Sequence, residues 1–392
     1  MNRGVGAFCI ALLLSLSTLT FQNLTIARSV TGEETEYYVK STVTYSNCGN
    51  NVWNFTEREE DRTIGLFMNN SWQTVYLENS TIFIEARKND TDGNQVALLQ
   101  FSEMVLNSGD NISYSVTYRV VSKPRTLGTI SERASGNLSR IPEPLKEKYL
   151  GAEGPWLVND TALQSLAYNI TGTESNVLTI VRNFVTWITE NISYETHETP
   201  LYPNETFSWR EGDCDDQAIL LVAMSRIVGI PAFLQIGAIY TSYPPQTNES
   251  YWGDHVTVVQ KRIGWHGWAM VYIPPWGWLP VDLTYVFGGI GDNPLNAITN
   301  AAVTSQGTIQ FMSISQIDYV ASSREARDFL VNNNFYVYLE DELIETIGRE
   351  NPFWESVRNL FPVVIVATGA LLLTGSYFIA RRLNRKEDMP TA

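Results

Sequence analysis

The sequence predicts an α+β fold with three successive parts: a β-sandwich, a helix packed on an antiparallel sheet, and a C-terminal transmembrane helix. Short alternating runs separated by turns occupy residues 36–121. An apolar helical stretch at Cys214–Val228 is followed by strand-like runs. An uncharged apolar run at 361–380 has the length of a bilayer core. The net charge of −15 argues against nucleic acid as a partner, because phosphates bind clustered Lys and Arg.

Residues 29–125 are expected to form the β-sandwich domain. Val39, Val43 and Tyr45 share one face of an alternating run, and four further strand-like runs follow. The segment Asn89–Asn94 has the composition of a hairpin turn. Several short strands with turns between them are typical of a small sandwich, which we expect to end near Arg125.

Residues 126–350 are expected to form a second, α+β domain. The predicted helix Cys214–Val228 stops at Gly229, a residue that readily ends helices. Gly and Pro separate the strand-like runs that follow it, which are Phe233–Tyr240, His255–Gln260, Trp268–Tyr272 and Trp278–Asp282. A helix followed by such strands predicts a helix that packs on an antiparallel sheet.

Cys214 is the candidate nucleophile of this domain. It lies at the predicted start of the helix, where the macrodipole and unpaired backbone N–H groups favour a thiolate and a developing oxyanion. Asp213, Asp215 and Asp216 act against ionisation, so activation requires a nearby cation such as histidine. The alternatives are a buried structural cysteine or a disulfide with Cys48.

His266 is the candidate base, and Asp282 the candidate group that orients it. The chain has three histidines; His197 lies in an acidic loop, while His255 and His266 both open strands. A short hairpin between the last two predicted strands would place Asp282 beside His266. His255 remains a rival base, but no comparable tryptophan and aspartate follow it.

Three local motifs resemble the transglutaminase-like superfamily, which has a papain-like fold. They are Gly212-Asp213-Cys214, His266-Gly267-Trp268 and Trp278-Leu279-Pro280-Val281-Asp282-Leu283-Thr284. The resemblance covers a core at about 165–290, with Gly267 where alanine is common and Leu283 where proline is common. It implies a catalytic triad in which Cys214 is the nucleophile, His266 the general acid and base, and Asp282 the orienting group.

The resemblance implies a cysteine-dependent acyl-transfer enzyme that acts on a protein or peptide. The thioester on Cys214 would be resolved by water, as in a protease or amidase, or by an amine, as in a transglutaminase. A further oxyanion donor is often found upstream of the cysteine, and Trp187 and Trp209 are candidates. No cofactor and no metal site is expected, since Asp254, His255, His266 and Cys214 fit no zinc spacing. The alternative is a catalytically inactive surface module for adhesion or for glycan or peptide binding.

The two ends of the chain predict export and membrane anchoring. Residues 1–28 are typical of a signal peptide, or otherwise of an N-terminal anchor. We expect a transmembrane helix at 359–380 and, because Arg381 and Arg382 follow it, a cytoplasmic tail at 381–392. The body would then lie outside the cell membrane. Glycosylation sequons support this placement and begin at Asn54, Asn69, Asn79, Asn89, Asn111, Asn137, Asn159, Asn169, Asn191, Asn204 and Asn248.

Overall fold

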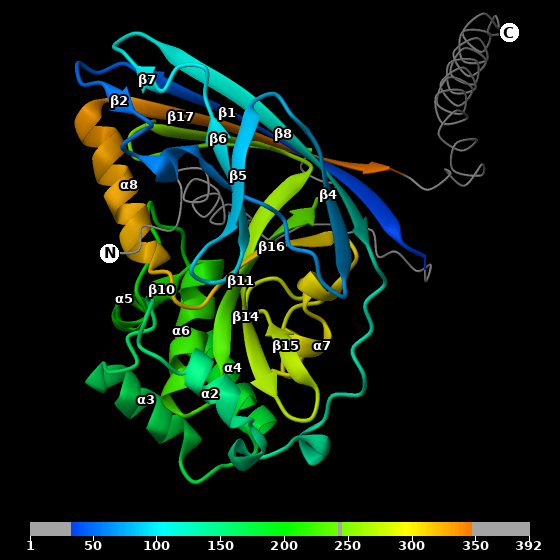
Figure 1. Cartoon of the computed structure of the whole chain (residues 1–392). Helices are drawn as coiled ribbons and strands as arrows, with labels where there is room; N and C mark the ends of the chain where they lie inside the picture. Colours follow the sequence, from blue (N-terminus) through cyan, green and yellow to red (C-terminus); the bar gives the residue numbers. More distant parts are fainter. Residues whose placement is uncertain (1–32, 242–244, 347–392) are drawn as a thin grey trace, which may run out of the picture. The chain divides into compact units, whose positions relative to one another are not determined.

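Two main β-sheets and one central helix organise the chain (Figure 1). The computed structural model describes residues 33–241 and 245–346. The larger sheet has six strands in the order β12-β13-β17-β1-β8-β4. Their bounds are β1 Thr35–Asn47, β4 Gln73–Ser80, β8 Asn111–Ser122, β12 Gln246–Tyr251, β13 Val256–Lys261 and β17 Phe335–Thr346.

A three-stranded sheet packs against the six-stranded sheet. Its strands are β3 Thr63–Gly65, β5 Phe83–Asn89 and β6 Gln95–Gln100, in the order β3-β6-β5. The Tyr118 hydroxyl on β8 donates to the Gly65 carbonyl at 3.1 Å, and the Phe101 ring meets Tyr45 and Tyr114. A short pair, β2 Trp53–Asn54 and β7 Val105–Leu106, adds Trp53, whose ring stacks on Phe335 at 4.6 Å. Aromatic packing therefore joins the two sheets.

The six-stranded sheet takes strands from both sides of residue 125. The hairpin β12–β13 and the strand β17 come from the part of the sequence that was assigned to the second domain. β17 lies between β13, to which it pairs in parallel, and β1. The described chain up to Glu345 lies in one compact unit. The sandwich is thus completed by later segments of the chain.

The second sheet carries the central helix. It has four strands in the order β15-β14-β11-β16, all antiparallel to their neighbours. Their bounds are β11 Ala232–Tyr240, β14 Ile263–Ile273, β15 Gly277–Val281 and β16 Thr308–Ile314. Helix α6, Cys214–Ile227, packs on β11 and β14. This arrangement confirms the predicted helix on an antiparallel sheet.

Helix α6 begins and ends at the residues that its sequence favours. Asp213 is the N-cap and forms a capping box with Asp216, while Gly229 adopts a φ of 85° just beyond the end. Every residue from Cys214 to Arg226 is buried. A helix that is covered on all sides needs neighbours all round, and α3, α4 and α5 cover the faces that the sheet leaves open.

The remaining helices surround this core. Those of the segment before α6 are α2 Glu143–Tyr149, α3 Thr161–Thr171, α4 Val177–Asn191 and α5 Pro203–Trp209. Those after it are α7 Asn296–Thr299 and α8 Tyr319–Asn333. The sequence predicts no helix in the segment 126–172, where α2 and α3 form.

Side-chain amides fasten the sandwich to the edge of the core sheet. Gln73 donates to the Gln310 carbonyl at 2.7 Å and accepts from the Gln310 N–H at 2.8 Å. Asn94 makes the same two contacts with Ser313, both at 2.8 Å. These amides take the place of a neighbouring strand along β16, so this edge is closed to further pairing.

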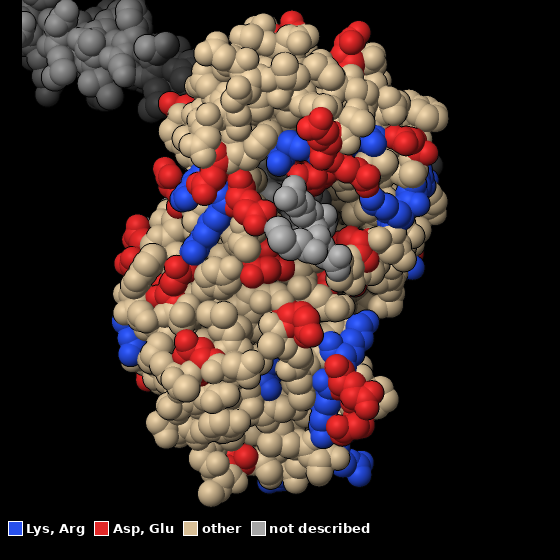
Figure 2. All heavy atoms as spheres, turned by 60° about the vertical axis from the view of Figure 1, so that its left-hand side comes forward, with Lys and Arg blue, Asp and Glu red and all other residues tan. Residues whose placement is uncertain are grey.

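The structure also bears on partners and on the membrane. On the face shown in Figure 2, Lys and Arg side chains are interspersed with Asp and Glu, with no concentrated basic area. None of the helices in the described part of the chain has the length and hydropathy needed to cross a bilayer. The predicted transmembrane helix at 359–380, the tail at 381–392 and the N-terminal segment 1–28 lie outside the described residues.

Candidate active site

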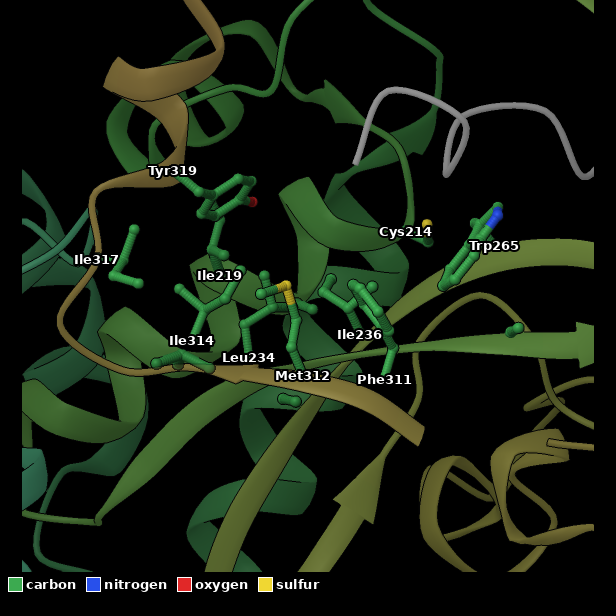
Figure 3. Close-up of a cluster of buried hydrophobic side chains, with 14 of the residues drawn as sticks. Cys214, Ile219, Leu234, Ile236, Trp265, Phe311, Met312, Ile314, Ile317 and Tyr319 are labelled. Carbon is green, nitrogen blue, oxygen red and sulfur yellow. The ribbon is translucent and has the colours of Figure 1, made fainter. Parts of the chain in front are cut away.

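Cys214 is the first residue of α6 and lies at the edge of the hydrophobic cluster between this helix and the sheet. Figure 3 draws Cys214 on the side of the cluster where Trp265 of β14 lies, and Ile219 of the same helix on the side of Leu234 and Ile314. The side chain is a free thiol with only 2% of its surface exposed. The sulfur accepts a hydrogen bond from the backbone N–H of Gly267. Cys214 therefore contacts the residue directly after His266.

Three buried carboxyl groups surround the thiol at the start of α6. Asp213 and Asp215 hydrogen-bond to each other, and the Tyr319 hydroxyl donates to Asp215 at 2.8 Å. Asp216 accepts from the backbone N–H of Leu201 at 2.7 Å. Burial raises the pKa of all three carboxyl groups, and that of Asp213 lies well above its usual value. Asp213 therefore keeps its proton and donates it to Asp215.

The same surroundings oppose ionisation of the thiol. Burial is the main reason that the pKa of Cys214 lies well above its usual value, and the negative charge of the hydrogen-bonded Asp213–Asp215 pair raises it further. The hydrogen bond from Gly267 acts in the other direction but is the weaker effect. The resting state is therefore a thiol, and a base must remove its proton when it reacts.

His266 and Asp282 form a buried pair in the β14–β15 hairpin. Nε2 of His266 lies 2.9 Å from Oδ2 of Asp282, and the two side chains are 0% and 1% exposed. A carboxylate can only accept a hydrogen bond, so this contact assigns the ring proton to Nε2. Nδ1 is then the nitrogen that would have to exchange a proton with a thiol. The structure thus brings His266 and Asp282 together as the hairpin predicted.

Backbone groups hold the Asp282 carboxylate in place. Oδ1 accepts from the backbone N–H groups of Thr284 and Tyr285 at 3.1 and 2.9 Å. The N–H of Asp282 itself donates to the Ala297 carbonyl at 2.8 Å, which ties the end of β15 to α7. Both carboxylate oxygens therefore have defined partners, and Oδ2 stays directed at the imidazole.

Aromatic rings fix the imidazole on two further sides. The Trp268 ring stacks on His266 at 6.0 Å with an interplanar angle of 24°. The Tyr285 ring meets His266 edge-on at 5.8 Å. Both rings belong to a second apolar cluster, which also includes Ile239 and Met270. The histidine can therefore move little without disturbing this packing.

Gly267 fits the start of α6 closely. A Cβ atom at this position would lie 2.9 Å from the Cβ of Asp215 and 3.3 Å from its Cα. Glycine therefore lets the helix start approach β14 until the sulfur reaches the backbone N–H. The sequence shows glycine where the family commonly has alanine, and here the tight contact with Asp215 accounts for it.

The other sequence candidates lie in different surroundings. The ring of His255 stacks on Tyr336 at 4.4 Å and its Nδ1 lies 2.8 Å from the Phe335 carbonyl, so this rival base belongs to the six-stranded sheet. His197 lies beside Glu211 and Trp209. Cys48 is an exposed free thiol, so the Cys48–Cys214 disulfide does not form.

The two tryptophans that were oxyanion candidates make other contacts. Trp187 packs against Phe207 and under the Arg210 guanidinium, 5.0 Å from its ring centroid. Trp209 is 53% exposed. Tyr194, which no sequence motif singled out, lies near the start of α6. No periodic pattern identifies it, because the strand that carries it has two residues.

One group of potential metal-binding atoms is present in the described part of the chain. The donor atoms of Asp213, Cys214 and Asp215 lie within 4.8 Å of one another. Two of these side chains already hydrogen-bond to each other, and Tyr319 takes a further carboxylate oxygen. The four-residue set weighed from the sequence, which includes Asp254 and His255, does not come together among the described residues.

Known proteins share this architecture. Residues 164–283 match the family model described as Transglutaminase-like superfamily. A solved structure from Cytophaga hutchinsonii, which carries the provisional name cysteine protease, is similar at a TM-score of 0.50 and 15% identity and covers 81% of this chain and 93% of its own. None of the curated proteins matches the chain significantly.

Two further solved structures are more distant. The periplasmic domain of TgpA from Pseudomonas aeruginosa, bound to ethylmercury, has a TM-score of 0.32 at 15% identity, over 76% of this chain and 97% of its own. Red sea bream transglutaminase has a TM-score of 0.27 at 10% identity, over 80% of this chain and 64% of its own. The match at 164–283 includes Cys214, His266 and Asp282. The chain therefore contains a domain of the transglutaminase-like superfamily at residues 164–283.

Proposed function

We propose that this protein is a cysteine-dependent acyl-transfer enzyme that attacks amide or peptide bonds through Cys214, His266 and Asp282. The observation that carries the proposal is the 2.9 Å contact between His266 and Asp282 on a strand whose next residue, Gly267, donates to the Cys214 sulfur. Nucleophile, base and orienting group thus come from one helix start and one hairpin. These two elements supply the three kinds of group that acyl-transfer chemistry needs.

The reaction begins when Nδ1 of His266 takes the proton of the Cys214 thiol as sulfur attacks the carbonyl carbon. A C–S bond forms and the carbonyl oxygen becomes an oxyanion. Collapse of this intermediate breaks the C–N bond, and the imidazolium returns its proton to the departing amine. The acyl group remains on sulfur as a thioester.

Water or a primary amine then resolves the thioester. His266 takes a proton from the incoming nucleophile and returns it to sulfur when the C–S bond breaks. The product is a carboxylic acid with water and a new amide with an amine. Both outcomes use the same three side chains, so we propose acyl transfer as the activity and leave the acceptor to experiment.

The test incubates the full-length chain in detergent with a peptide mixture and a labelled primary amine. Mass spectrometry distinguishes cleavage or deamidation from amine incorporation. We expect Cys214→Ala and His266→Ala to abolish product, and His255→Ala, a histidine on the other sheet, to retain it. Product that survives Cys214→Ala would refute the proposal.

Thiol labelling separates the enzyme from a binding module on the same fold. Iodoacetamide should label Cys214 at a rate that rises with pH and falls in His266→Ala, because the base assists loss of the proton. Labelling of Cys214 that is independent of His266 would support the inactive surface module instead.

We also propose that the body lies outside the cell and is anchored by residues 359–380. Sequon asparagines support this placement: nine are exposed, and Asn54 and Asn204 are half-buried. Protease treatment of intact cells should degrade the body and spare a tag on the C-terminus. A body that is protected until the cells are lysed would contradict this placement.

A further inference from the structure

Tyr194 is held beside the turn that leads into Cys214. It ends the short strand β9, Ser193–Tyr194, which pairs in parallel with β10, Glu211–Gly212. The Ser193 N–H donates to the Arg210 carbonyl at 2.9 Å, and the Glu195 N–H donates to the Gly212 carbonyl at 3.4 Å. Tyr194 therefore lies opposite Gly212, two residues before the thiol.

The phenol of Tyr194 faces the reacting end of α6. Its oxygen atom is buried. Burial raises the pKa of Tyr194, and a negative charge on Cys214, Asp213 or Asp215 would raise it further, because the phenol lies near these groups. The hydroxyl therefore keeps its proton at every working pH. A protonated phenol in this position can donate a hydrogen bond.

The proposed reaction creates a need for such a donor. When the Cys214 sulfur attacks a carbonyl, negative charge develops on the carbonyl oxygen beside the helix start. The first N–H groups of a helix have no partners within the helix, so they can supply one hydrogen bond. Stabilisation is usually completed by a second donor, and the packing of Trp187 and the exposure of Trp209 leave Tyr194 as the better-placed side chain.

We propose that the Tyr194 hydroxyl donates a hydrogen bond to the oxyanion that forms during attack by Cys214. The inference rests on the proposed acyl-transfer function. The proton stays on the phenol throughout, and the bond strengthens as the carbonyl oxygen gains charge. Tyr194 is then a catalytic residue supplied by a two-residue strand that precedes the nucleophile by twenty positions.

Tyr194→Phe tests this role because it removes one oxygen atom and keeps the ring. We expect kcat for amide hydrolysis or transfer to fall about 10²–10³-fold, as on loss of one oxyanion donor. Affinity for a peptide aldehyde should fall in parallel, since its adduct on Cys214 places an oxygen in the same position. Alkylation by iodoacetamide should keep its rate, because sulfur displaces iodide from carbon and no oxyanion forms.

The control is Tyr168→Phe, which removes a phenol hydroxyl that donates to the Ile227 carbonyl on α6 from an exposed side chain. It should leave kcat and alkylation unchanged. Equal losses of turnover and alkylation in Tyr194→Phe would show that the phenol positions the thiol, and would overturn the proposal.

Failure of this inference can be told apart from failure of the proposed function. If Tyr194→Phe keeps full turnover while Cys214→Ala has none, the oxyanion role is wrong and the enzyme stands. Aldehyde affinity needs no turnover, so it tests the hydroxyl even before a substrate is found. If aldehydes form no adduct on Cys214 in the unmodified protein, both proposals fail.

Discussion

The start of α6 and the β14–β15 hairpin both bury carboxyl groups near Cys214. They differ in the groups that surround each carboxyl group. At the helix start, Asp213 and Asp215 hydrogen-bond to each other and share a proton, and burial raises the pKa of both. In the hairpin, Asp282 stands alone and accepts hydrogen bonds from two backbone N–H groups and from the imidazole.

The difference lies in how many carboxyl groups each region brings together. The hairpin offers Asp282 three N–H groups and holds it next to His266. The helix start crowds its carboxyl groups together, so protons have to be retained. A buried acid near a nucleophile can thus orient the base, or it can restrain ionisation of the thiol. The hairpin carboxyl group of Asp282 has the first effect, and the carboxyl groups at the start of α6 have the second.

Asp282→Asn tests whether the carboxylate of the hairpin orients His266, and it should have the largest effect. Asparagine can donate to Nε2 and thereby force the wrong imidazole tautomer, so we expect kcat to fall about 10³–10⁴-fold with little change in KM. Steady-state kinetics measures the effect, with a peptide that the incubation with labelled amine identifies as a substrate. Asp160→Asn, a substitution at the N-cap of α3, is the matched control. A loss of less than tenfold would mean that Asp282 is only a structural cap.

Asp215→Asn tests whether the carboxyl groups at the start of α6 restrain ionisation of Cys214. This variant should make the thiol more reactive, whereas Asp282→Asn should lower activity. The charge of Asp215 raises the pKa of Cys214, so its removal should lower that pKa and speed alkylation at neutral pH by roughly 3- to 10-fold. The side-chain amide oxygen of the variant could still accept from Tyr319, which limits structural damage. The pH dependence of iodoacetamide labelling checks this, and its midpoint should move to lower pH. Slower labelling would show that Asp215 assists ionisation.

Local patterns were sufficient to predict the position of α6 and the pairing of His266 with Asp282. Asp213 before an apolar helical run, with Gly229 behind it, predicts α6 to within one residue of its end. Strand alternation and the Gly-Pro turn place His266 and Asp282 on adjacent strands. These features depend on contacts between residues that are close in sequence, which is why the sequence alone reveals them.

What the sequence did not predict depends on distant segments or on very short ones. The insertion of β17 between β13 and β1 joins strands that lie far apart in the chain, and no periodicity encodes such a partner. Tyr194 belongs to a two-residue strand, too short for any alternation to show. Helix α3 is different, because Asp160 is an N-cap followed by Leu163 and Ala167 on one face, a signal that could have been recognised.

Asp341 provides a third buried carboxylate for this comparison, because it contacts the strand that carries His266 through Trp265 and not through the imidazole. It lies on β17 and accepts from the Trp265 indole N–H at 2.9 Å. Successive residues of a strand point to opposite faces, so this contact lies on the face away from His266. We therefore expect Asp341→Asn to leave kcat nearly unchanged and to affect mainly the pH dependence of stability.

The sign of that effect follows from the direction of the pKa shift. Burial raises the pKa of Asp341 from 3.8 to about 6, so the folded state holds this proton more tightly than the unfolded chain does. The resulting stability, about 3 kcal/mol at most, is complete below about pH 4 and is lost as the pH rises through 6. In Asp341→Asn this part of the pH dependence should disappear, so thermal unfolding followed between pH 4 and pH 8 should give a flatter curve. If the stability of the variant depends on pH in the same way as that of the unmodified protein, Asp341 is ionised in both the folded and the unfolded state. Burial would then raise the pKa of the carboxyl groups at the start of α6 but not that of Asp341.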